Sequence, residues 1–125
     1  MQWCPKYRKQ IFADEAIKRD CEQALKEAAT EKGIRLAELA VMPDHVHTIV
    51  VANRPVPLSE IEFYLKGRSA HELFRKHPEL RQQYWGGHLW SRSTFSRTIG
   101  LDAEKACRYV RHQHDAHQHK IWDYN

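Results

Sequence analysis

The sequence predicts an α+β domain of the ferredoxin-like, RRM-like split βαβ class, a four-stranded antiparallel sheet with helices on one face and an extra C-terminal helix. Apolar residues recur at helical spacing in three stretches, and short alternating or wholly apolar runs lie between them. The resulting order is strand, helix, strand, strand, helix, strand, helix, and its first six elements make the split βαβ pattern. We expect residues 1–125 to form one domain, because this length is ordinary for one and no linker-like tract interrupts it.

The first strand and the first helix lie in the N-terminal third of the chain. Residues 2–4 can be extended, and a basic turn follows them. Residues 14–32 predict a helix, since their apolar side chains form one stripe. Asp14 is the expected N-cap and Gly33 the residue that ends the helix.

Two strands are expected next. Residues 34–41 alternate between apolar and polar side chains, with room for a bulge. A tight connection at 43–44 leads to a very apolar strand over residues 45–52. A strand of that composition is typical of the centre of a sheet.

The remaining elements are a helix, a strand and a further helix. Ser59 and Glu62 have the spacing of a capping box for the second helix, which His77-Pro78 ends. An aromatic, glycine-containing loop then leads into a last strand that reaches Ile99. The extra helix is expected from Ala103 to about Gln118.

Charge and cysteine content narrow the class of protein. The net charge is +4 with histidine neutral, which hints at a polyanionic partner. The three cysteines, Cys4, Cys21 and Cys107, have no CxxC spacing, which favours a reducing compartment over a disulfide framework or a cysteine zinc site. No signal peptide and no bilayer-length apolar run are visible, so we expect a cytoplasmic protein without a membrane partner.

His45 and His47 are the first candidate site residues. Side chains alternate along a strand, so both imidazoles point to one face and Val46 to the other. Two such rings can hold one divalent metal ion, although hydrogen-bonded core histidines would satisfy the same pattern. Neutral ligands leave the charge of the ion uncompensated, and such an open site attracts a phosphate oxygen.

The extra helix offers a nucleophile and a third ligand. Tyr109 and Gln113 are four residues apart, so they share one helix face. Gln113 could bind the metal through its amide oxygen while Tyr109 attacks a phosphodiester. The alternatives are an aromatic side chain packed on the sheet and a surface amide.

Five segments, in order along nearly the whole chain, resemble the single-tyrosine HUH transposases of the IS-two-hundred class of insertion sequences. They are Trp3-Cys4-Pro5-Lys6-Tyr7-Arg8, Met42-Pro43-Asp44-His45-Val46-His47, Leu65-Lys66-Gly67-Arg68-Ser69, Tyr84-Trp85-Gly86-Gly87-His88-Leu89-Trp90-Ser91 and Arg108-Tyr109-Val110-Arg111-His112-Gln113.

The resemblance implies a transposase that cuts and rejoins single-stranded DNA at hairpin-marked ends of a mobile element. Tyr109 would form a 5′-phosphotyrosine link, and His45, His47 and Gln113 would bind magnesium or manganese. It also implies a homodimer, in which the tyrosine helix of one subunit can complete the active site of the other.

Basic residues around the predicted sheet are weaker candidates for contacts with the DNA backbone. They are Lys6, Arg8, Lys66, Arg68, Arg92 and Arg97. Two other functions fit the same pattern. One is a domesticated relative that acts on genomic hairpin repeats, and the other is a non-catalytic module that binds single-stranded nucleic acid, a use that the split βαβ fold also serves.

Overall fold

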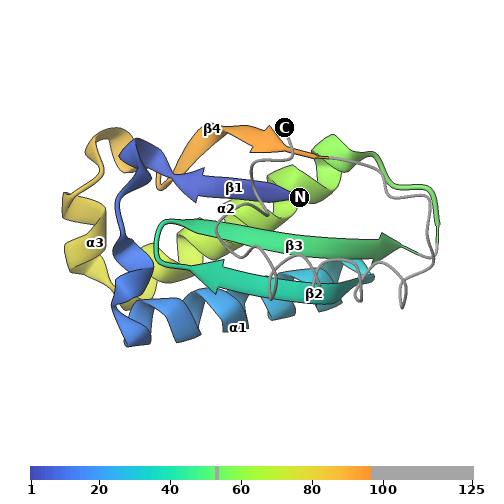
Figure 1. The fold of residues 1–125 in the computed structure, drawn as a ribbon, viewed down its shortest axis with the longest axis horizontal. Helices are drawn as coiled ribbons and strands as arrows, with labels where there is room; N and C mark the ends of the chain where they lie inside the picture. The colour runs from blue at the N-terminus through green and yellow to red at the C-terminus, as the bar shows by residue number, and fades with distance from the viewer. Residues whose placement is uncertain (53, 97–125) are drawn as a thin grey trace, which may run out of the picture.

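The computed structural model describes residues 1–52 and 54–96. Within them the chain forms an antiparallel sheet with helices packed against it (Figure 1). The elements in chain order are β1 (Gln2–Pro5), α1 (Glu15–Lys32), β2 (Ile34–Met42), β3 (His45–Ala52), α2 (Leu58–Lys76), α3 (Pro78–Gln82) and β4 (Trp90–Phe95). Three 3-10 turns, Lys6–Arg8, Ile11–Ala13 and Trp85–Gly87, connect them.

The sheet confirms the predicted split βαβ architecture. Its strand order is β2-β3-β1-β4, and every neighbouring pair is antiparallel. The register of β2 against β3 shifts between Leu36 and Glu38, which confirms the expected bulge. The expected extra helix, the end of the last strand and the residues they carry lie outside the described residues.

Helix α1 begins and ends as its sequence predicts. The Asp14 carboxylate accepts hydrogen bonds from the backbone amides of Ala16 and Ile17, at 2.9 and 3.2 Å. Gly33 closes the helix in the left-handed conformation, with φ of 73°, and donates to the carbonyls of the last turn.

The prediction for the start of α2 was wrong. The helix begins at Leu58, with Pro57 at the N-cap position and no side-chain cap. The Pro57 carbonyl accepts from the amides of Glu60 and Ile61, so Ser59 already lies inside the first turn and cannot cap it. Helix α3 was not expected either. It starts at Pro78, a residue that ends α2 and also fits the first position of a new helix.

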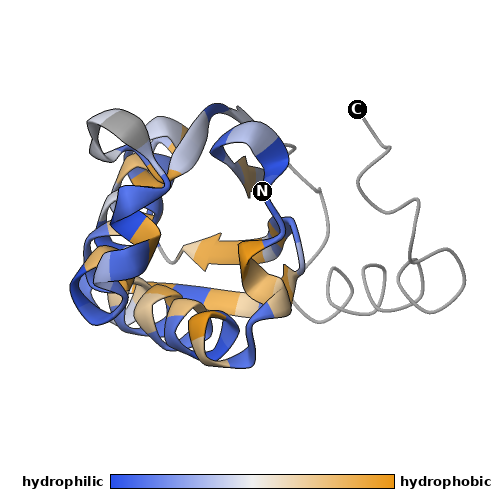
Figure 2. Ribbon diagram, turned by 90° about the vertical axis from the view of Figure 1, so that its left-hand side faces the viewer, coloured by the Kyte–Doolittle hydropathy of each residue, from blue (hydrophilic) through white to orange (hydrophobic). Residues whose placement is uncertain are grey.

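Helices α1 and α2 lie together on one side of the sheet (Figure 2). Cys21 and Leu25 of α1 and Leu65 and Leu73 of α2 are wholly buried beneath them. A buried leucine contributes about 1.5–3 kcal/mol relative to an exposed one, so this interface holds much of the folding energy. None of the helices described is long and apolar enough to span a membrane.

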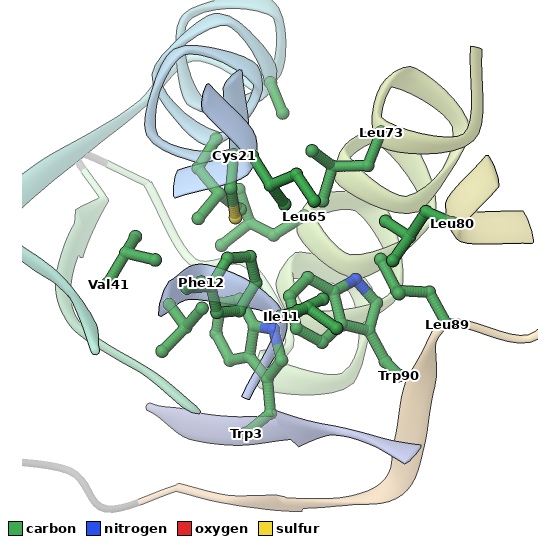
Figure 3. Packing of buried hydrophobic residues seen from close by; sticks show 14 of the residues in the cluster. Trp3, Ile11, Phe12, Cys21, Val41, Leu65, Leu73, Leu80, Leu89 and Trp90 are labelled. Atoms are coloured by element: carbon green, nitrogen blue, oxygen red, sulfur yellow. The ribbon is translucent and has the colours of Figure 1, made fainter. Parts of the chain in front are cut away.

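Aromatic rings fill the part of the core that lies next to β1 and β4. Trp3 meets Trp90 edge to face, with ring centroids 6.0 Å apart, and Phe12 lies 5.8 Å from Trp90 (Figure 3). The indole of Trp90 donates to the Lys66 carbonyl and to the Ser69 hydroxyl, so it also binds β4 to α2. Burial raises the pKa of the Cys21 thiol, which is therefore a packed and unreactive group.

Candidate active site

His45 and His47 project from the face of the sheet opposite to helices α1 and α2. Val46, between them, is fully buried in the core and pairs with Trp3 on one side and Val41 on the other. Since neighbours on a strand point to opposite faces, both histidines belong to the other face, as predicted. The structure therefore brings this candidate pair together.

Strand pairing places the histidines among specific neighbours. His47 is paired with Gln2 of β1 and Ala40 of β2, and Gln2 is paired in turn with Phe95 of β4. These four residues form one row across the sheet. His45 stands at the start of β3, is 3% exposed and is paired with Met42.

Asp44 holds the ring of His45. Its Oδ1 lies 2.8 Å from Nδ1 of His45. A carboxylate can only accept, so Nδ1 carries the hydrogen and Nε2 presents a lone pair. A carboxylate behind a histidine is the arrangement that commonly orients metal-ligating imidazoles.

The turn that carries Asp44 is anchored from both sides. The amide of Phe12 donates to the Pro43 carbonyl at 3.1 Å. The Arg8 guanidinium reaches Oδ2 of Asp44 at 3.5 Å. The basic turn after β1 is thus brought beside β3, called the HxH strand after His45 and His47, although the two are far apart in sequence.

The donor set fits a divalent ion in part. Two imidazoles on one face, one of them held by a carboxylate, could bind a borderline divalent ion, and oxygen ligands would have to complete the set for magnesium or manganese. Residues 1–52 and 54–96 contain no group of three histidine, cysteine or carboxylate side chains placed to hold a metal. Tyr109 and Gln113, the predicted nucleophile and third ligand, lie outside the described residues.

Four of the six basic candidates fall into two groups. Lys6 and Arg8 lie in the 3-10 turn after β1, where Arg8 reaches Asp44. Lys66 and Arg68 lie on α2, on the other side of the sheet. Arg92 is exposed on β4, and Arg97 lies outside the described residues.

Lys66 and Arg68 have partners within the protein. The Lys66 side chain is 13% exposed, and its Nζ donates to the Ser91 carbonyl at 2.8 Å and to the Thr94 hydroxyl at 2.9 Å. Arg68 donates twice to one carboxylate oxygen of Glu31, and this bond raises the pKa of the guanidinium. Both side chains connect structural elements, and their roles as DNA contacts remain predictions.

A cavity of about 830 Å³ lies between α2 and the segment that leads into β4. Phe63, His71, Arg81 and His88 are among the residues that line it. It is on the helix side of the sheet and so separate from His45 and His47.

Sequence reasoning did not predict the contact of Asp44 with His45 and identified Asp44 only as part of a tight connection. The available signal was a carboxylate directly before the HxH pair. The same reasoning grouped Tyr7 with Lys6, Arg8 and Lys9 as a basic-aromatic cluster, to be either a solvated loop or a nucleic-acid contact.

The chain is similar to known transposases over most of its length. Residues 1–113 match the family model described as transposase IS200 like. The chain is 32% identical to the ISDra2 transposase TnpA of Deinococcus radiodurans over 114 residues, which cover 90% of this chain and 81% of that protein. It is 29% identical to the transposase for insertion sequence element IS200 of Salmonella typhimurium, with coverages of 89% and 72%.

A solved structure agrees with the fold. A crystal structure from Deinococcus radiodurans R1, described as that of a candidate transposase, superposes with a TM-score of 0.70 at 33% identity. The match covers 90% of this chain and 86% of that one.

Proposed function

Because this chain belongs to the family of IS200-like transposases, and is therefore a DNA transposase, we propose that it cleaves and rejoins single-stranded DNA through a tyrosine nucleophile. The observation that carries the proposal is the HxH strand. It presents His45 and His47 on one face, with the tautomer of His45 set by Asp44. His45 and His47 would hold a divalent ion, which would supply Lewis-acid chemistry to a phosphodiester.

Tyr109 is the proposed nucleophile. Its hydroxyl loses a proton, and its oxygen attacks the scissile phosphorus. The bond from phosphorus to the 3′ oxygen breaks, and that oxygen takes up a proton. The products are a 5′-phosphotyrosine link and a free 3′-OH, which can reverse the step on another phosphotyrosine without an external energy source.

His45, His47 and Gln113 are the proposed ligands of magnesium or manganese. Asp44 orients the ring of His45 and also forms an ion pair with Arg8. Three neutral ligands preserve the positive charge of the ion for the phosphate. We propose hairpin-bearing single strands as the substrate and a homodimer as the active form.

A covalent-adduct assay tests the proposed reaction. The full chain is incubated with manganese and single strands of the DNA that flanks its coding sequence. A protein–DNA adduct is expected, and mass spectrometry of the linked peptide should locate the DNA on Tyr109. Tyr109→Phe should lose the adduct and keep DNA binding.

Tyr64→Phe is the matched control, since Tyr64 lies on α2 on the other side of the sheet. This variant should form the adduct as the unmodified chain does. An adduct that survives in Tyr109→Phe would show that the nucleophile is a different residue. DNA binding without any adduct would favour the non-catalytic binding module.

A further inference from the structure

The ring of Tyr7 lies on the surface, and the next residue, Arg8, reaches Asp44 at the start of the HxH strand. Tyr7 is 66% exposed, whereas Trp3, four residues earlier in the chain, is 2% exposed and belongs to the core. Most of the Tyr7 ring is therefore open to contact with a ligand, and the groups around it indicate which kind of ligand.

The Tyr7 ring is held in place from below. It stacks on Tyr84, with centroids 6.4 Å apart and planes 11° from parallel. Tyr84 is 1% exposed and packs in turn against Phe74, with centroids 6.4 Å apart. One face of the exposed ring thus rests on the core, so a second flat group could stack on it with little further loss of side-chain freedom.

The backbone also fixes this arrangement. Tyr7 and Arg8 have φ values of 67° and 50°, the left-handed region that residues other than glycine rarely adopt. Two such residues in succession hold a strained turn, which is typical of segments shaped for function. The turn is anchored at its start, where the Lys6 amide donates to the Leu89 carbonyl at 2.8 Å.

Positive charge surrounds the ring. Nζ of Lys6 lies 5.5 Å and Nζ of Lys9 5.9 Å from the Tyr7 centroid. The Arg8 side chain is 62% exposed. An aromatic platform with flanking cations is the feature by which proteins stack a base of single-stranded nucleic acid and hold its phosphates.

The platform adjoins the candidate active site. Arg8 reaches Asp44, and Asp44 binds His45. We propose that Tyr7 stacks an unpaired base of the DNA strand bound at the HxH site, with Lys6 and Lys9 on the neighbouring phosphates. This inference rests on the proposed single-stranded substrate and adds a residue that positions it.

Equilibrium binding tests the platform without any cleavage. Fluorescence anisotropy would compare the full chain on labelled (dT)20 and on an equally long strand of abasic deoxyribose phosphates, which keeps the charges and removes the bases. The unmodified chain should prefer (dT)20. Tyr7→Leu should weaken (dT)20 binding about tenfold and leave binding to the abasic strand unchanged, whereas Tyr7→Trp should retain the preference.

Phe63→Leu is the matched control. Phe63 is 81% exposed, but it lies on α2, on the far side of the sheet. Its replacement should leave both affinities unchanged. Equal affinities of Tyr7→Leu and the unmodified chain for (dT)20 would overturn the proposal, as would the absence of any preference for (dT)20 in the unmodified chain.

Photocrosslinking of the unmodified chain gives a second measurement that does not depend on how the variants fold. A (dT)20 strand with 5-iododeoxyuridine should crosslink to the peptide that contains Tyr7, and crosslinks confined to other peptides would contradict the platform.

The adduct assay separates the two proposals. An adduct on Tyr109 with no effect of Tyr7→Leu on binding would contradict the proposed role of Tyr7 and leave the cleavage reaction standing. Crosslinks at Tyr7 without an adduct would contradict the cleavage reaction and leave the role of Tyr7 standing.

Discussion

The carboxylate of Asp44 and the imidazole of His45 are bonded across 2.8 Å between adjacent residues of one turn. This contact determines which ring nitrogen carries the hydrogen before any ion is bound. The same carboxylate accepts a hydrogen bond from the Arg8 guanidinium. Asp44 therefore links the turn after β1 to the start of β3. Four predictions follow from this and other described contacts.

Asp44→Asn should weaken manganese binding about 10- to 100-fold, the range found when a carboxylate behind a ligating histidine is replaced. An amide can donate to Nδ1 as well as accept from it, so it no longer selects one tautomer. Isothermal titration calorimetry measures the affinity. Asp20→Asn is the control, since Asp20 contacts His77 at 2.7 Å at a distance from the site. Equal losses in both variants would contradict a specific role for Asp44.

His45→Ala should lose manganese affinity and abolish DNA cleavage, because it removes a proposed ligand. Calorimetry and the adduct assay give the two readouts. His71→Ala is the control, since His71 is exposed on α2. Manganese affinity that is unchanged in His45→Ala would remove this residue from the ligand set.

Lys66→Met should destabilise the fold by about 1–3 kcal/mol, because it leaves the Ser91 carbonyl and the Thr94 hydroxyl without their charged donor. Urea unfolding followed by circular dichroism measures this loss. Arg92→Met should leave stability nearly unchanged, since Arg92 is exposed. If Lys66 instead contacts phosphate, the salt dependence of DNA binding will fall by about one unit of slope in Lys66→Met.

The free energy of unfolding should fall between about pH 10 and pH 12, because the Tyr84 hydroxyl ionises in this range. Burial raises the pKa of its hydroxyl from 10.0 to about 12, and this hydroxyl has no hydrogen-bond partner among the described residues. This hydroxyl loses its proton at a lower pH in the unfolded chain than in the folded protein. Its contribution to the free energy of unfolding is therefore complete below pH 10 and declines by roughly 2–3 kcal/mol as the pH rises to 12.

Tyr84→Phe should remove that part of the alkaline destabilisation and leave stability at pH 7 unchanged or higher, since it deletes a buried polar group. Denaturant unfolding at pH 8, 10 and 11 compares the variant with the unmodified chain. Tyr64→Phe is the control. Parallel pH profiles for the unmodified chain and Tyr84→Phe would show that a different group causes the loss.

Local chemistry made much of the fold predictable. Asp14 and Gly33 act through bonds within their own helix turns, and the HxH alternation follows from strand geometry alone. Ser59 was misjudged because the N-cap of α2 is Pro57, two residues nearer the N-terminus. Helix α3 was missed because Pro78 was treated only as an end.

The rest of the candidate site depends on contacts between distant segments. No local pattern indicates that Arg8 reaches Asp44, since this contact requires left-handed backbone at residues other than glycine. The stacking of Tyr7 on Tyr84 likewise joins two loops that are remote in sequence. Tyr109 and Gln113 stay predictions from helical spacing and resemblance.

Strand β1 has a consequence for the order in which the protein is built. Its residues sit between β3 and β4, and Trp3 is paired with Thr94 near the end of the described chain. Helix α1 and the β2–β3 hairpin involve short loops and can form while the ribosome is still adding later residues. We expect the sheet, and with it the stacked tyrosines, to close only after β4 has left the exit tunnel, so the nascent chain should acquire protease resistance late.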